Sequence, residues 1–112
     1  MTPTSKQMIE VKPYALLFQA LANPTRVLIL SALRGRGTLS VTQIVEELGL
    51  EQTNASHNLR CLAFCGLVTV SRQGKSRIYS LNKKTVLPLL DIAEDHLKRF
   101  AVNLLSCDVL ER

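Results

Sequence analysis

Two short helical patterns joined by a tight turn constrain the fold of this chain more than any other feature. The first begins after Ser40, which forms with Gln43 the sequence of a capping box, and its apolar residues recur at helical spacing. Only residues 49–51, beginning with Gly49, separate it from a second pattern with apolar residues along one side. Two short helices joined by a turn that contains glycine are typical of a helix-turn-helix.

A β-hairpin is predicted directly after the second of these helices. Residues 67–71 alternate with β character, residues 72–75 have the composition of a turn, and residues 77–81 return as a second strand. A hairpin at this point is a wing. Helical patterns also follow Tyr14, Asn23-Pro24 and Thr85. The sequence therefore predicts a mainly α fold with a small β-hairpin, a winged helix-turn-helix of about five helices and a two-stranded wing.

The chain is expected to form one domain. Its 112 residues are too few for two domains of ordinary size, and it has no internal repeat or linker rich in proline and glycine. We expect a flexible N-terminal arm over residues 1–12, the winged domain over residues 13–106 and a C-terminal tail over residues 107–112. The wide apolar stripe of the last helix predicts packing against a second copy of the chain.

Composition excludes several classes of protein. With 46% apolar and 21% charged residues, the chain is typical of a globular protein rather than a disordered one. No apolar stretch approaches the roughly 18 residues of a membrane span, and the N-terminus lacks the hydrophobic core of a signal peptide. Three cysteines, an odd number, argue for reduced thiols. We therefore expect a cytoplasmic protein with no membrane partner.

Positive charge is concentrated in one segment. Residues 52–84 contain six basic residues and no acidic one, within a chain of net charge +5. Such a block is the electrostatic footprint of a surface that binds a polyanion, although a solvated basic surface would have the same composition.

The second helix of the pair starts within this basic segment, so we expect it to contact DNA. Its polar residues avoid the apolar side, and amide, hydroxyl and guanidinium groups can pair with base edges or phosphates. The basic residues of the wing suit phosphate contacts. The candidates are Gln52, Thr53, Asn54, Ser56, His57 and Arg60 on the helix, and Arg72, Lys75 and Arg77 on the wing.

Several stretches together resemble the ArsR/SmtB family of metal-responsive winged-helix repressors. The resemblance covers most of the chain from about residue 14 onward, and it is carried by residues 20–30 (ALANPTRVLIL), 55–62 (ASHNLRCL), 65–68 (CGLV) and 74–79 (GKSRIY). It implies a homodimer in which the first and last helices form the interface. It also implies that each recognition helix enters the major groove of an inverted-repeat operator, with the wing beside it.

Within that family, the cysteine pattern is closest to the CmtR-type cadmium/lead sensors, which implies a metal site formed by Cys61, Cys65 and Cys107. Residues four apart lie on one helical face, so Cys61 and Cys65 can point at one ion, and Cys107 could supply a third thiolate. Thiolates favour soft or borderline ions, so Cd(II) or Pb(II), with Zn(II) as a further possibility, is the expected effector. The family's other thiolate element would fall near residues 41–44, where this chain has no cysteine.

Other readings of these residues stay open. Cys61, Cys65 and Cys107 could form a redox or reactive-sulfur switch, or be inert buried thiols in a constitutive DNA-binding repressor. His96, together with Glu94, Asp108 and Glu111, could bind Zn(II), although a solvated acidic helix face explains the same pattern. His57 and Cys61 could form a catalytic pair, but the sequence suggests neither an orienting group nor a pocket for a small-molecule substrate, and we predict no enzyme activity.

Overall fold

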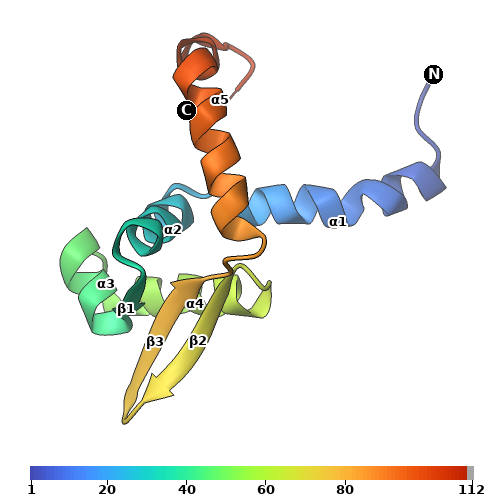
Figure 1. Ribbon diagram of the computed structural model, residues 1–112. Helices are drawn as coiled ribbons and strands as arrows, with labels where there is room; N and C mark the ends of the chain where they lie inside the picture. Colours follow the sequence, from blue (N-terminus) through green and yellow to red (C-terminus); the bar gives the residue numbers. More distant parts are fainter. Residues whose placement is uncertain (111–112) are drawn as a thin grey trace. The chain divides into compact units, whose positions relative to one another are not determined.

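The computed structural model describes residues 1–110, and within them five helices and three strands follow one another as Figure 1 shows. The helices are α1 (Ser5–Leu21), α2 (Pro24–Arg36), α3 (Val41–Leu48), α4 (Gln52–Phe64) and α5 (Val86–Ser106), and the strands are β1 (Thr38–Ser40), β2 (Val68–Gln73) and β3 (Ser76–Leu81). The chain divides into two compact units, of which the first is Met1–Leu81 and the second begins at Asn82. The predicted helix-turn-helix and wing both lie in the first unit.

The helix-turn-helix forms as its local signals predict. The Ser40 hydroxyl accepts from the Gln43 backbone N–H over 3.2 Å, and the Gln43 side chain accepts from the Ser40 N–H over 2.8 Å, which closes a capping box at the start of α3. Helix α3 ends at Gly49, whose left-handed conformation, with φ at 65°, turns the chain into α4.

The wing belongs to a sheet of three strands rather than two. Strand β3 lies between β1 and β2 and pairs antiparallel with both, so that Tyr79 lies opposite Leu39 on one side and Val70 on the other. The predicted two-stranded wing is present as β2 and β3, and β1 is a third strand that the sequence did not predict. Three residues are too few to show an alternating pattern, and β1 is stabilised by its pairing with β3. In Figure 1 the β2–β3 hairpin projects beyond α4.

The core of the first unit lies between α2, α3, α4 and the base of the sheet. Branched and aromatic side chains from each element are buried there, and their removal from water is the main source of stability in such a domain. They include Ile29, Leu30, Leu33, Leu39, Ile44, Leu59, Leu62 and Tyr79. This packing fixes which side of α4 faces solvent.

The N-terminal residues are helical, which corrects the flexible arm predicted over residues 1–12. Helix α1 starts at Ser5, because the Thr4 hydroxyl accepts from the Gln7 N–H over 3.1 Å and the Gln7 side chain accepts from the Thr4 N–H over 2.8 Å. Pro13, where order was expected to begin, lies inside this helix. None of the residues of α1 is buried.

None of the described helices is long and apolar enough by itself to cross a membrane. Only α1 and α2 taken together reach the necessary length and composition, and the two are bent by 74° at the break between them.

Candidate nucleic-acid interface and thiol pair

The solvent-facing side of α4 carries the polar residues predicted to contact DNA. The helix buries Ala55, Leu59 and Leu62, so its other side is left open. Of the six predicted residues on α4, Ser56 is half-buried and the rest are exposed, namely Gln52, Thr53, Asn54, His57 and Arg60. This face offers amide, hydroxyl and guanidinium groups of the kind that can pair with base edges.

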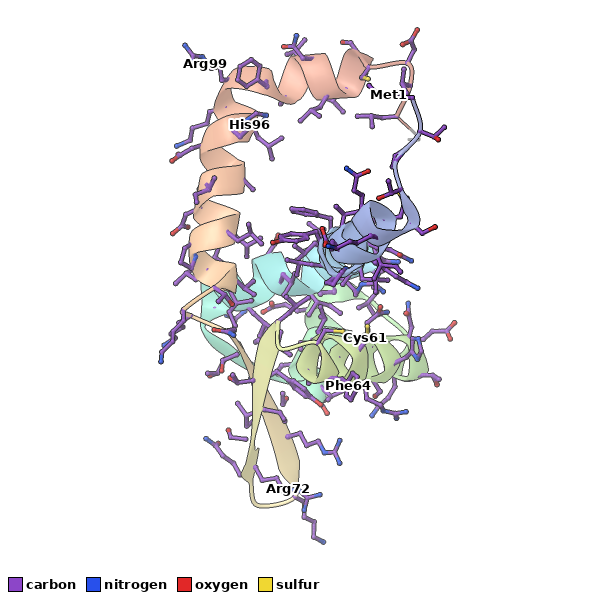
Figure 2. All side chains as sticks on the ribbon, turned by 90° about the vertical axis from the view of Figure 1, so that its right-hand side faces the viewer. Met1, Cys61, Phe64, Arg72, His96 and Arg99 are labelled. Atoms are coloured by element: carbon purple, nitrogen blue, oxygen red, sulfur yellow. The ribbon has the colours of Figure 1, made fainter. Side chains whose placement is uncertain are left out.

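The wing presents the three predicted basic residues to solvent. Arg72, Lys75 and Arg77 are all exposed, and Figure 2 shows Arg72 on the β-hairpin. Arg72 and Arg77 lie directly opposite each other in the β2–β3 ladder. Like charges in such a pair destabilise a sheet, so this arrangement favours the presence of an anionic partner.

A shallow polar depression brings the wing and α4 together. Its lining comes from the start of α3, the first residue of α4 and the turn of the wing, and comprises Ser40, Val41, Thr42, Gln52, Lys75, Ser76 and Arg77. Two of these residues are cationic and none is acidic. The structure therefore places Gln52 of the helix beside Lys75 and Arg77 of the wing, in a surface suited to phosphate oxygens.

Cys61 and Cys65 lie on consecutive turns at the C-terminal end of α4, where Figure 2 labels Cys61 and its neighbour Phe64. The sequence predicted both cysteines inside the helix, but α4 ends at Phe64 and Cys65 is its C-cap residue. The Cys65 N–H still donates to the Cys61 carbonyl over 3.0 Å, which preserves the four-residue helical spacing. The two thiols also interact with each other, because Cys61 is one of the groups that raise the pKa of Cys65.

The surroundings of this thiol pair change the acidity of Cys65. Partial desolvation raises the pKa of the Cys65 thiol, and its interaction with Cys61 raises that pKa further, whereas the Arg26 guanidinium lowers it. The thiol is therefore protonated at neutral pH, and an ion that binds there must displace a proton. Cys65 is exposed beside α1, in a depression lined by Pro13, Leu16, Leu17 and Ala20.

Two residues that sequence reasoning missed connect α4 to the rest of the first unit. Asn58 is only 5% exposed, and its amide N–H groups donate to the Asn54 carbonyl over 3.0 Å and to the Asn54 side-chain oxygen over 2.7 Å. The Asn58 side-chain oxygen accepts from Arg26 over 3.4 Å. The only signal in the sequence was a polar residue at a position where the helical pattern requires burial.

The remaining candidates lie in the second unit. Cys107 is half-buried and caps the end of α5. His96 is exposed, with its ring 4.8 Å from that of Phe100. Glu111, named above with His96, lies outside the described residues. Over residues 1–110, no three His, Cys, Asp or Glu side chains are grouped so as to hold a metal ion.

Comparison with known proteins gives consistent matches for this arrangement. A family model described as "Bacterial regulatory protein, arsR family" matches residues 23–70. The HTH-type transcriptional regulator NmtR of Mycobacterium tuberculosis is 49% identical over 78 residues, which are 70% of this chain and 64% of NmtR. A probable mercury resistance operon repressor of Streptomyces lividans is 38% identical over 79 residues, 70% of this chain and 62% of the repressor. The chain thus spans a little under two thirds of the length of these two relatives.

A solved structure matches over more of its own length. The crystal structure of Rv0081 of M. tuberculosis superposes with a TM-score of 0.76 at 33% identity, covering 85% of this chain and 95% of that one. The match confirms the predicted fold class.

Proposed function

The chain belongs to the arsR family of bacterial regulatory proteins, and we propose that it is a metal-responsive transcriptional repressor that binds operator DNA as a homodimer. This family consists of DNA-binding regulators and not of enzymes, in agreement with the prediction that the chain has no enzyme activity. The proposal rests chiefly on one observation: the helix that exposes the DNA-contacting candidates also ends in two cysteines one helical turn apart.

DNA binding is supported by the continuity of the polar surface. The exposed side of α4, the depression at its start and the basic wing lie in one unit and carry no acidic residue between positions 52 and 84. We propose that α4 enters the major groove through Gln52, Thr53, Asn54, Ser56, His57 and Arg60, while Arg72, Lys75 and Arg77 contact phosphates.

Metal binding is supported by the chemistry of the thiol pair. Two sulfurs one helical turn apart suit a soft ion, and the name of the S. lividans relative attaches that protein to mercury resistance. Two thiolates leave such an ion with too few ligands, so we propose Cys107, from the same or the other subunit, as the third. Cd(II) or Pb(II) is the proposed effector, with Zn(II) as the alternative ion. The raised pKa of Cys65 reduces its thiolate fraction, which counts against a redox switch.

The experiment that tests this function measures DNA binding with and without metal. A duplex is first selected from a random-sequence library with the reduced protein, and its affinity is then measured by fluorescence anisotropy. We expect Cd(II) and Pb(II) to release the duplex and Mg(II) to have no effect. The same ions should produce sulfur-to-metal charge-transfer absorption in the ultraviolet.

Three matched variants assign the ligands. Cys61→Ser and Cys65→Ser should each abolish release at metal concentrations that release the wild type, and Cys107→Ser should raise the concentration required. Release by peroxide but not by metal would indicate a redox regulator instead. A protein that stays bound to the duplex in the presence of either metal or peroxide would be a constitutive repressor.

A further inference from the structure

The guanidinium of Arg26 joins two helices that do not follow each other in the chain. Arg26 lies in the first turn of α2, where the Asn23 side chain caps the helix by accepting from the Arg26 N–H over 3.1 Å. Its Nε donates to the Ala20 carbonyl over 2.6 Å and its Nη2 to the Gln19 carbonyl over 3.2 Å. Its Nη1 donates to Asn58 of α4 over 3.4 Å. One half-buried side chain thus holds the end of α1 to the middle of α4.

The contacts at α1 hold one side of the guanidinium and leave Nη1 directed at Asn58. The last carbonyls of a helix lack partners within the helix and carry the negative end of its dipole, so a cation is favourable there. The planar fork of arginine can serve two such carbonyls and still donate a third hydrogen bond in another direction. That third donor is the one directed at Asn58.

Asn58 extends this connection to the exposed face of α4. Its amide N–H donates to the Asn54 side-chain oxygen over 2.7 Å, and this contact determines how the Asn54 side chain is turned. An asparagine can pair with a base edge only when its donor and acceptor face the matching groups. A change at Arg26 would therefore alter the orientation of the Asn54 side chain, in the first turn of α4.

Arg26 also acts on the thiol pair. Its charge is one of the influences on Cys65, and Ala20, whose carbonyl it binds, lines the depression that contains Cys65. The guanidinium is therefore within electrostatic reach of the sulfurs and in contact with the hydrogen-bonded chain that leads to Asn54.

We propose that Arg26 is a positioning residue that couples the Cys61–Cys65 pair to the DNA-contacting end of α4 through Asn58 and Asn54. This inference rests on the metal site of the proposed function. Three thiolates around a divalent ion leave one net negative charge, which attracts the guanidinium more strongly than the neutral amide of Asn58 does. The hydrogen bond from Arg26 to Asn58 then weakens, and Asn58 no longer holds the Asn54 side chain in one orientation. The affinity for DNA falls as a result.

The test compares the ratio of DNA dissociation constants with and without Cd(II) in four variants. Arg26→Gln removes the charge and the fork, and Asn58→Asp keeps an acceptor for Arg26 while removing the donors to Asn54. Both should lower the ratio at least about fivefold while the Cd(II)–thiolate absorption and stoichiometry persist. Arg26→Lys, which keeps the charge, should retain part of the wild-type ratio. Arg36→Gln is the matched control, because Arg36 lies on the same helix and pairs with Glu47 of α3.

A second readout separates coupling from a loss of fold. In the wild type, Cd(II) should shift the side-chain amide signals of Asn54 and Asn58 in ¹⁵N spectra, and in Arg26→Gln it should not. If Arg26→Gln fails to fold, Asn58→Asp decides the outcome. Folded variants that keep the wild-type ratio would overturn the role of Arg26 alone, whereas a wild type insensitive to metal would overturn the proposed function as well.

Discussion

At the scale of single residues, the Cys65 thiol is exposed yet held in its protonated form. Partial desolvation and the neighbouring Cys61 raise its pKa, and only the thiolate reacts with alkylating agents. At pH 8 we therefore expect iodoacetamide to modify Cys65 of the folded protein more slowly than Cys65 of the same chain unfolded in denaturant. Peptide mapping by mass spectrometry gives the rate at each cysteine.

The rate of Cys65 alkylation should depend on pH in a direction set by the raised pKa. Because the pKa of Cys65 is raised only in the folded protein, the alkylation rates of the folded and unfolded chains should converge at high pH, where Cys65 is ionised in both. Cys61→Ser removes a neighbouring thiol that raises the pKa of Cys65, so it should speed the alkylation of Cys65 at pH 8. Equal rates in the folded and unfolded chains at pH 8 would contradict the raised pKa.

Single residues also show how far the candidate site could be predicted from the sequence. The helical period separates the exposed His57 and Arg60 from the buried Leu59, because a side chain's face depends only on its position along the helix. The link between Arg26 and Asn58 could not be predicted, since it joins residues 32 positions apart whose proximity exists only in the fold.

At the scale of elements, the capping box of α3 is a source of stability that can be measured by itself. Ser40→Ala removes the oxygen that accepts from the Gln43 N–H, while the buried Ile44 keeps its place in the core. A lost N-cap of this kind costs about 1 kcal/mol. Urea denaturation should show that decrease in the free energy of unfolding. Ser71→Ala, on an exposed position of the wing, is the control and should change it by less than about 0.5 kcal/mol.

The wing should contribute affinity without sequence preference. Lys75 lies in the polar depression beside Gln52, and a lysine that contacts a phosphate releases counterions whatever the base sequence. Lys75→Ala should weaken selected and random duplexes by similar factors and reduce the slope of log affinity against log salt by about 1 per subunit. Anisotropy titrations at several salt concentrations measure that slope. A loss confined to the selected duplex would instead mean that Lys75 contacts bases.

The elements also differ in how well their local signals predict them. The capping box of α3 and the alternation of the hairpin lie within a few residues, and both elements form where the sequence indicates. Strand β1 has no pattern of its own and exists because β3 pairs with it. The helical pattern after Tyr14 predicts α1 too late, because the capping box at Thr4 sets its start and the first turns of the helix bury no residue that would mark them.

At the scale of the whole molecule, two helices leave large apolar side chains in water. None of the residues of α1 is buried, and the helix exposes Ile9, Tyr14, Leu16 and Phe18 among others. Helix α5 likewise exposes large apolar residues, Leu105 among them. Apolar surface on this scale marks an interface. A second copy of the chain is the partner that fits the proposed function, because a twofold dimer would present one recognition helix to each half of an inverted-repeat operator.

Charge placed on this surface should therefore separate the subunits. Phe18 is 59% exposed, so Phe18→Asp leaves the core of the first unit intact but would bury a carboxylate in a dimer interface at high cost. Sedimentation velocity should show a monomer, with weaker binding to a two-half-site duplex and unchanged binding to a single half-site. Phe64→Asp is the matched control, because Phe64 is 92% exposed on α4 and its replacement should leave the sedimentation coefficient unchanged. A dimer that persists with Phe18→Asp and dissociates with Phe64→Asp would show that the interface lies on α4 and not on α1. Helix α4 could not then contact DNA in the dimer.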